Sequence, residues 1–489
     1  MELEPLPQPG RAAPMSPGAY PEQRWIAMAV LLAAAFMNLI DVSIVNVALP
    51  SLLRAFRATP AQIEWVVAAY ILTFALLLLP AGRLGDILGR RRMFVTGIGV
   101  FTFGSALCGL APGVGALVAA RVLQATGGAL MMPQTLALVP VLFPPQERGK
   151  AFALFGLASG LASVMGPVLG GFLIGQDIAG LDWRPIFLVN VPIGLIAIPL
   201  SLRLVPEIRG NHPLKLDLVG VLLAAATLLA VVFPLIEGRE AGWPAWIFVT
   251  LAAALPLGAT FAAWETRLAR AGRPQLLPVS LLADKGFVLG TVLSTLLYSG
   301  IPGFFVVLAV FLQSGFGLDP MHSGMMTMPF SIGVMAASLT SGRLGNRWQR
   351  QRITAGAGFL ALAMFGLRWT VEGTGAAIDW PFYAPFLLLG GLGLGTCISP
   401  IFQVVLTSVP GRDTGSASGA LQAFQQVGGA LGVAILGQIF FARLQALSNA
   451  PDAHVVYKDA MAAALVYNST AFLAIAVLIW LIPQPEPQG

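Results

Sequence analysis

Long apolar runs are the feature that most limits what this chain can fold into. About 20 apolar residues are needed to cross the hydrocarbon core of a bilayer, and runs of that length recur along the whole sequence with short basic stretches between them. Because only helices and closed barrels satisfy their backbone in lipid, each run predicts a transmembrane helix. Fourteen runs are counted, at 26–49, 62–81, 93–111, 115–142, 150–174, 184–204, 216–236, 244–264, 286–312, 323–342, 353–371, 381–404, 416–441 and 460–482.

Composition supports an all-α membrane protein. Charged residues make up 10% of the 489 residues, whereas soluble domains carry roughly 25%, and the mean hydropathy is +0.81. The net charge of +6 does not predict a nucleic-acid partner, because the basic residues lie in short loops between the apolar runs. Cys108 and Cys397 fall inside apolar runs and the three histidines are scattered. The sequence therefore predicts no disulfide framework, no metal site and no cofactor.

The distribution of basic residues predicts the orientation. Most of the 28 Lys and Arg residues fall in loops on the side that an even helix count assigns to both termini. Basic loops stay in the cytoplasm, so both termini are predicted to be cytoplasmic in a multi-pass protein of the bacterial inner membrane. The Pro-rich ends, 1–24 and 484–489, are interpreted as cytoplasmic tails, the first one disordered and without a signal-peptide cleavage site.

An internal repeat divides the chain. The string at 82–86, Gly-Arg-Leu-Gly-Asp, returns at 342–346 as Gly-Arg-Leu-Gly-Asn, and Ala-Ser-Gly at 158–160 returns at 417–419 with nearly the same offset. Such repeats are typical of transporters built from two halves with a substrate site between them, which work by alternating access. The predicted parts are a six-helix bundle at 25–208, two inserted helices at 209–270 and a second six-helix bundle at 271–483.

Asp41 and Arg121 are the two ionisable residues that stand clearly within the apolar runs. From the helical rise, Asp41 lies roughly 13 Å and Arg121 roughly 12 Å from helix ends on the same side of the membrane. At this common depth they can pair directly or through water. The pair is either an inert link between two helices or a site where Asp41 carries a proton under the control of the arginine.

Asn38 and Gln124 lie one helical turn from Asp41 and Arg121, respectively. Each side chain either tunes the charged pair and lines a substrate cavity or forms an ordinary interhelical hydrogen bond. The two interpretations carry equal weight.

Polar and aromatic residues elsewhere in the runs are candidates for the lining of that cavity. Glutamines inside a membrane helix have to face protein or water, and methionine-rich stretches suit varied apolar ligands, although packing filler explains any single methionine. The other predicted lining residues are Tyr70, Phe74, Tyr298, Phe305, Met325, Phe402, Gln403, Gln422, Gln425 and Gln426.

Glycines and a proline gather in the run at 150–174. Gly166, Pro167, Gly170 and Gly171 lie on closely spaced positions, where glycines let backbones approach and the proline bends the helix. The pattern is explained either by tight packing alone or by faces that separate during a transport cycle.

Five segments together resemble a known family. They are Leu39–Pro50, Gly82–Arg92, Arg121–Gly128, Gly160–Gly171 and Trp183–Gly194. With these segments in order, the chain resembles the major facilitator superfamily and, within it, the fourteen-helix drug:proton antiporters of the multidrug efflux branch. The resemblance covers the whole chain apart from the tails.

The resemblance implies roles for matching residues. Asp41 would be the proton-coupling acid and Arg121 its partner. Gly82, Asp86 and Arg90 would form a cytoplasmic gate, made asymmetric because Asn346 replaces an acid in the repeat. The antiporter motif, Gly166, Pro167, Gly170 and Gly171, would mark an exporter.

The implied function is export of hydrophobic neutral or monocationic compounds, such as drugs, antibiotics and amphipathic metabolites, in exchange for protons. Some relatives that expel dications carry extra acids in helices 2 and 10, and neither the segment 65–70 nor the run at 323–342 contains an acid. A narrow-substrate metabolite exporter and a proton symporter of the same superfamily are the alternatives. A polytopic membrane enzyme is disfavoured, because no loop offers a catalytic cluster. Participation of a periplasmic adaptor is left open.

Overall fold

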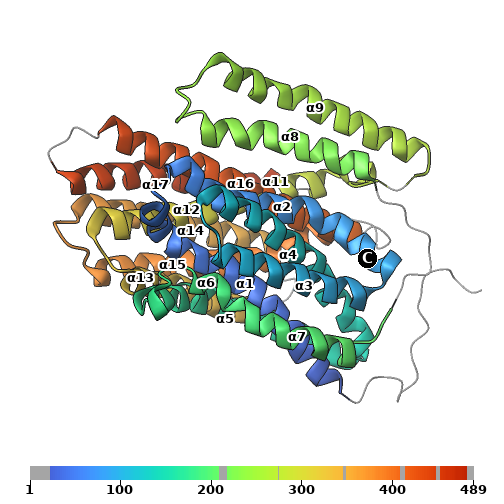
Figure 1. Cartoon of the computed structure of the whole chain (residues 1–489). Helices are drawn as coiled ribbons and strands as arrows, with labels where there is room; N and C mark the ends of the chain where they lie inside the picture. The colour runs from blue at the N-terminus through green and yellow to red at the C-terminus, as the bar shows by residue number, and fades with distance from the viewer. Residues whose placement is uncertain are drawn as a thin grey trace, which may run out of the picture.

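A computed structural model describes residues 23–208, 217–273, 275–344, 348–407, 414–447 and 452–481. This part of the chain is helical and contains no strand, and its helices form one elongated bundle (Figure 1). The predicted tails lie almost wholly outside the described residues.

The helices are as follows. The first group is α1 (Arg24–Phe56), α2 (Pro60–Leu88), α3 (Arg90–Gly109), α4 (Val114–Leu142), α5 (Pro145–Gly175), the 3-10 turn η1 (Ile178–Gly180), α6 (Pro185–Leu188) and α7 (Asn190–Leu204). A pair follows, α8 (Leu218–Glu237) and α9 (Ala245–Arg270). The last group is α10 (Val279–Ala283), α11 (Lys285–Ser299), α12 (Pro302–Val310), the π-helical η2 (Phe311–Gly315), α13 (Pro320–Leu344), α14 (Gln349–Gly373), α15 (Trp380–Thr407), α16 (Thr414–Ala446), α17 (Ala453–Leu478) and η4 (Ile479–Leu481).

Twelve spans in the described residues are long and apolar enough to cross a membrane, so the chain is a multi-pass membrane protein. Fourteen were expected. The two expected spans outside this set, 150–174 and 323–342, fall on α5 and α13, which are 31 and 25 residues long. Within the described residues α5 has a shorter apolar stretch, Met165–Gly175, and α13 carries histidine, serine and threonine side chains, which lower its apolarity.

Three predicted helices differ in their limits. α1 continues through Pro50 to Phe56, since membrane helices tolerate a proline when neighbours restore the lost backbone contacts. The expected helix at 184–204 is split into α6 and α7, and the one at 286–312 is split at Gly300 and ends in a π-helical turn.

The two ends of the bundle need names. We call the end at which α1 ends and α2 begins the distal end.

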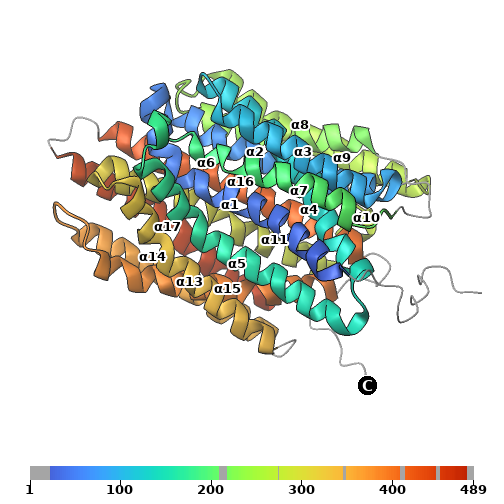
Figure 2. The ribbon, with the colours of Figure 1, turned by 60° about the horizontal axis from the view of Figure 1, so that its bottom comes forward.

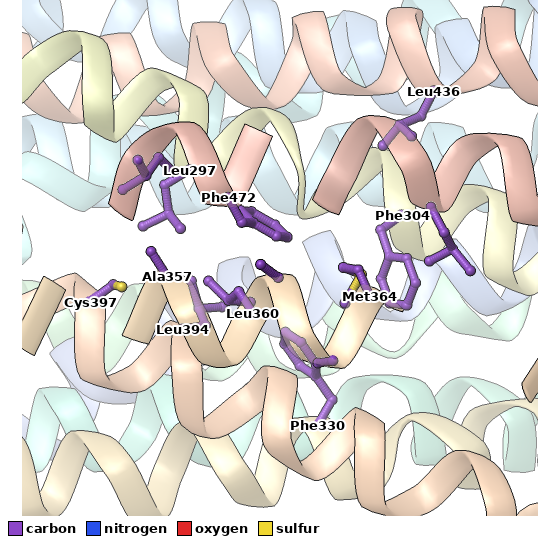
Figure 3. Close-up of a cluster of buried hydrophobic side chains, with 14 of the residues drawn as sticks. Leu297, Phe304, Phe330, Ala357, Leu360, Met364, Leu394, Cys397, Leu436 and Phe472 are labelled. Atoms are coloured by element: carbon purple, nitrogen blue, oxygen red, sulfur yellow. The ribbon is translucent and has the colours of Figure 1, made fainter. Parts of the chain in front are cut away.

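Packing falls into two groups of helices. In the first, α3 and α2 pack on α4, while α5 and α7 pack on α1; in the second, α13 and α14 pack on α15, and α11 and α12 pack on α16. The second group encloses a large apolar core that includes Leu360, Met364 and Phe472 (Figure 3). Contacts between the groups run mainly through α2 with α16, α5 with α13 and α1 with α12, and Figure 2 shows α5 beside α13 along the bundle.

The pair α8–α9 lies along one side of the bundle (Figure 1). α8 contacts α2 and α16, whereas α9 packs chiefly on α8 and leaves apolar side chains such as Val249 and Leu255 exposed. An exposed apolar helix face is stable in lipid rather than in water. The pair therefore touches both groups while facing the hydrocarbon.

Candidate functional site

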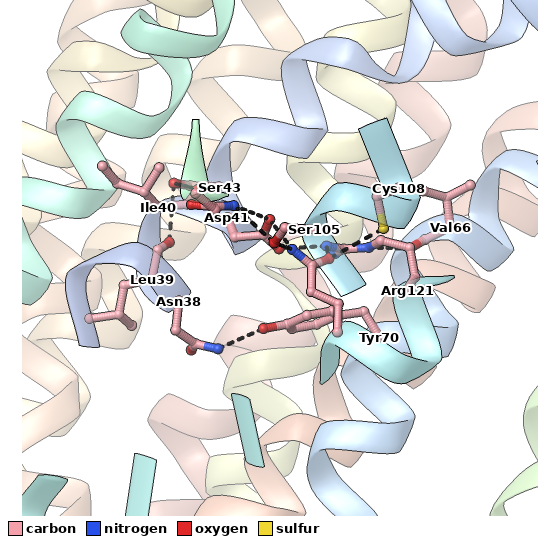
Figure 4. Close-up of polar contacts among 12 residues, drawn as sticks. Asn38, Leu39, Ile40, Asp41, Ser43, Val66, Tyr70, Ser105, Cys108 and Arg121 are labelled. Carbon is pink, nitrogen blue, oxygen red and sulfur yellow. Dashed lines mark hydrogen bonds and ion pairs between the residues drawn. The ribbon is translucent and has the colours of Figure 1, made fainter. Parts of the chain in front are cut away.

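α1 and α4 bring the two intramembrane charges together. Figure 4 shows the two side chains pointing toward one another. Arg121 Nη1 lies 2.5 Å from Asp41 Oδ2, and the side chains are 2% and 0% exposed. The predicted pairing is thus confirmed, and its cause is the common depth set by the helical rise. Because both charges are removed from solvent, each depends on protein groups for its stabilisation.

Three donors surround the Asp41 carboxylate. In addition to Arg121, Gln124 Nε2 donates to Oδ1 at 2.7 Å and Asn190 Nδ2 donates to Oδ1 at 3.2 Å. The Ser105 hydroxyl accepts hydrogen bonds from the same two amides, at 2.7 Å and 3.4 Å. Hydrogen bonds of this kind compensate the buried negative charge of a carboxylate.

The sequence prediction missed two members of this network. Asn190 lies in the segment Trp183–Gly194 that contributes to the family resemblance, but the resemblance assigns no role to this residue. Ser105 is one of several hydroxyl side chains in α3, and nothing in the sequence distinguishes it from the others. Both residues come from other helices, α7 and α3, and residue spacing alone does not show how these helices are rotated about their axes.

The arginine is held from several sides. Its Nε donates to the Val66 carbonyl at 3.2 Å, its Nη1 donates to Gln124 Oε1 at 2.7 Å, and its Cζ lies 4.0 Å from the centre of the Tyr70 ring. Asn38 Nδ2 donates to the Tyr70 hydroxyl at 2.7 Å. Asn38 therefore forms an interhelical hydrogen bond and fixes the ring that faces the guanidinium, whereas Gln124 bonds the charged pair directly.

The predicted antiporter motif on α5 lies against both α1 and α13. A Cβ on Gly166 would meet the Ser43 hydroxyl at 1.8 Å, and one on Gly171 would meet the Pro320 carbonyl at 2.5 Å. Ser43 follows Asp41 by half a helical turn. The small residues therefore allow a close crossing of helix backbones beside the charged pair.

A cavity of about 160 Å³ lies between the two groups of helices. Its wall includes Ser43 and Asn46 of α1, Pro167 of α5, and Phe305 and Thr327 of the second group. Among the predicted lining residues, Phe305 faces this cavity, with its ring 5.1 Å from that of Phe330. The cavity wall and the Asp41 network thus share one turn of α1.

The other predicted lining residues are dispersed. Met325 lines a separate groove of about 970 Å³ between α13 and α15. Gln425 donates to the Ser294 hydroxyl at 3.0 Å, and Gln403 accepts from Gln349 at 3.2 Å, so both bond neighbouring helices of the second group. Four partly buried residues, Tyr298, Phe402, Gln422 and Gln426, and Phe74, which stacks on Tyr70, are not among the residues that line the 160 Å³ cavity.

The predicted gate is only partly described. Gly82 lies in α2, and Arg90 begins α3 with its Nη1 donating to the Ala137 carbonyl of α4 at 2.7 Å. The side chain of Asp86 lies outside the described residues, as does Asn346 of the repeat. The bond between Asp86 and Arg90 therefore stays a prediction.

Sequence comparison decides the family. The family model named Major Facilitator Superfamily matches residues 31–433. The chain belongs to the Major Facilitator Superfamily. It is a non-enzymatic transporter, with a membrane-spanning helical bundle of the kind described above.

Curated relatives of this major facilitator carry transport and resistance names. A probable actinorhodin transporter of Streptomyces coelicolor is 39% identical over 446 residues, covering 90% of this chain and 77% of that protein. A puromycin resistance protein of Streptomyces alboniger is 35% identical, covering 85% and 82%. The multidrug resistance protein Stp of Mycobacterium tuberculosis is 33% identical, covering 84% and 75%.

Solved structures share the fold. A POT family transporter in complex with 5-aminolevulinic acid aligns with a TM-score of 0.66 at 14% identity, covering 93% of this chain and 95% of that one. A bacterial homologue of the human lysosomal transporter Spinster, inward-facing and unoccupied, aligns at 0.65 with 15% identity, covering 94% and 97%. At these identities the likeness concerns the fold alone.

In addition to Asp41 and Arg121, further ionisable side chains are buried near the ends of the membrane spans of this major facilitator. Glu64 of α2 and Glu265 of α9 are 0% and 1% exposed, and Arg239, expected in a loop, is 9% exposed. Glu265 accepts hydrogen bonds from the backbone amides of Leu276 and Leu277. These residues stand near the ends of apolar runs, where spacing does not distinguish a solvated charge from a buried one.

Proposed function

We propose that this major facilitator exports hydrophobic neutral or monocationic compounds in exchange for protons by alternating access. The observation that carries the proposal is the buried Asp41–Arg121 pair, whose acid stands on α1, the helix that also supplies Ser43 and Asn46 to the wall of the cavity between the two groups of helices. Burying a carboxylate in a membrane helix costs free energy, and the carboxylates that are found there mark substrate or ion pathways. Export of drugs agrees with the names of the relatives.

Proton exchange at Asp41 follows from how its charge is compensated. In the present arrangement three donors favour the carboxylate. Movement of α4 or α7 away from α1 removes donors and favours the protonated acid. Because helix movement and proton affinity are linked in this way, a proton gradient drives the cycle.

We further propose the finer architecture of the antiporter branch. α5 and α13 cross the membrane in addition to the twelve spans, giving fourteen helices. α1–α7 form the bundle at 25–208, α8 and α9 are the insert at 209–270, and the bundle at 271–483 follows. Both termini are cytoplasmic in the bacterial inner membrane, because basic residues such as Arg90, Arg91 and Arg92 lie at the end opposite the distal end.

The motifs receive roles within this cycle. Gly166, Pro167, Gly170 and Gly171 form the crossing along which α5 separates from α13 when the distal end opens. Their support is the close backbone approach at this crossing. Gly82, Asp86 and Arg90 hold the cytoplasmic end closed while the distal end is open. The predicted lining residues beyond Phe305 contact substrate once the cavity opens.

A narrow-substrate exporter is the second candidate, because one relative is named for transport of a single compound, actinorhodin. The cavity wall is mainly apolar and is free of charged side chains, which agrees with apolar substrates in either case. A periplasmic adaptor has no support from the described residues.

Export is tested in a drug-sensitive bacterium that produces this protein and is loaded with lipophilic monocationic dyes. We expect dye to leave faster than from cells with the empty vector, and we expect a protonophore to abolish the difference, because the proton gradient supplies the energy. Dye efflux that persists without the gradient contradicts proton exchange. If no dye of a broad panel leaves but a single natural product does, the narrow-substrate candidate is correct.

A further inference from the structure

Glu64 is a buried acid near the distal end of α2 whose charge is poorly compensated. Its side chain is 0% exposed. Oε1 lies 3.5 Å from Arg239 Nη2, and Oε2 has no hydrogen-bond partner among the described residues. When a buried carboxylate has a single long contact, most of the free-energy cost of removing it from water is not offset.

Arg239 is shared among several acceptors. Besides Glu64, it donates to the Gly437 carbonyl of α16 at 3.2 Å, lies 3.9 Å from Glu240, and stands over the Phe441 ring at 5.1 Å. Three charged groups act on Glu64: Arg239 and Glu240 of the α8–α9 turn, and Glu237 at the end of α8. The Arg239 guanidinium therefore faces the carboxyl groups of Glu64 and Glu240, and among the described residues α16 adds a backbone carbonyl and an aromatic ring.

The contrast with Asp41 is direct. Asp41 has three donors on its two oxygens, the shortest at 2.5 Å, whereas Glu64 has one contact at 3.5 Å. Both acids are fully buried. The protein therefore compensates the charge of Asp41 far better than that of Glu64.

Glu64 lies where the two groups of helices meet. A Cβ on Gly437 of α16 would stand 2.4 Å from the Glu64 carboxyl carbon. The turn that joins α8 to α9 closes over the same place, with the Trp65 indole donating to Glu237 at 2.8 Å and the Ala61 amide donating to Glu240 at 3.0 Å. Separation of α2 from α16 removes the backbone that covers Glu64 and admits water.

We propose that Glu64 is a second proton-binding site, which holds a proton while α2 and α16 are in contact and releases it when they separate. The inference rests on the proposed alternating-access cycle. The state with a closed distal end binds the proton more tightly than the open state. By linkage, low pH therefore favours closure and high pH favours opening. The inserted helix pair acts in this site by supplying Arg239, Glu237 and Glu240.

The test is a distance measurement on the purified full-length protein, which needs no substrate. Spin labels on Ala55→Cys and Gln445→Cys report the gap between the distal ends of α1 and α16, since both positions are exposed and the native cysteines are buried. We expect the short-distance population to fall as the pH is raised from about 5 to about 9, a range that covers the titration of a carboxyl group shifted by burial. In Glu64→Gln this dependence is lost and the short distance persists at both ends of the range.

Both proteins carry Asp41→Asn as a common background, which removes the pH dependence that the proposed coupling at Asp41 contributes, so that the dependence that remains has Glu64 as its source. In this background, a distance that does not respond to pH when Glu64 is present, or a response that survives in Glu64→Gln, overturns the proposal. Failure of drug export leaves this readout unchanged, so the two proposals are tested separately.

A second measurement uses the wild-type protein, so it tests the proposal even if Glu64→Gln does not fold. Dicyclohexylcarbodiimide reacts with protonated carboxyl groups in apolar surroundings, and peptide mass spectrometry locates the adduct. We expect the adduct on Glu64 at neutral pH and little on Asp41. An adduct on Asp41 with none on Glu64 contradicts the assignment.

Discussion

Arg121→Met abolishes export and lowers the free energy of unfolding by about 3–5 kcal/mol, the usual loss when one partner of a buried ion pair is removed. The reason is the location of Asp41, which is 0% exposed and has Arg121 as its one charged partner at 2.5 Å. Methionine fills much of the space of the arginine but leaves the carboxylate with the two amides alone. The stability of the purified variant in detergent is measured by thermal unfolding.

The double variant Asp41→Asn with Arg121→Met is the control. Because it removes both charges, it regains most of the lost stability while it remains inactive in export. Equal instability of the single and double variants would mean that the arginine stabilises the helices by packing on Tyr70 and Phe187 rather than by compensating Asp41.

Gly324→Leu reduces export at least tenfold and destabilises the protein by about 1–3 kcal/mol, the cost typical of overpacking. Its Cβ would lie 2.3 Å from the Pro167 carbonyl oxygen, at the crossing of α13 with α5. A backbone oxygen cannot rotate aside, so the two helices have to move apart. The distal end is therefore held open.

Gly358→Leu on α14 is the matched control, because nothing lies within 4 Å of a Cβ at that position. We expect export and thermal stability close to those of the wild type. Export rates and unfolding temperatures of both variants are compared at equal protein amounts in the membrane. Normal export by Gly324→Leu would show that this crossing does not have to close during the cycle.

Residue spacing could predict the Asp41–Arg121 pair because the rise of a helix fixes depth in the membrane, and two charges at one depth attract each other across neighbouring helices. It could not predict Asn190 or Ser105, since their contact with the pair depends on how α7 and α3 are rotated. The same reason explains why most predicted cavity residues are dispersed while Phe305 lines the cavity.

The fold shows a similar limit. Apolar runs predict that helices exist but not where they break: the sixth predicted helix is divided between α6 and α7, and the ninth is interrupted at Gly300, just before Pro302 begins α12. Arg239 stands just after an apolar run, so it was assigned to a solvated loop. In the structure the α8–α9 turn folds onto α2 and α16 and buries the arginine against Glu64.

The central claim is that Asp41 couples proton movement to export, and proton-driven dye transport in everted membrane vesicles tests it most directly. Wild type and Asp41→Asn are compared under the same gradient, with dye binding and proton flux recorded together. We predict that wild type moves dye and protons in step, whereas Asp41→Asn binds dye but transports neither. If Asp41→Asn transports dye with protons as well as the wild type does, Asp41 is structural and the account of coupling is wrong.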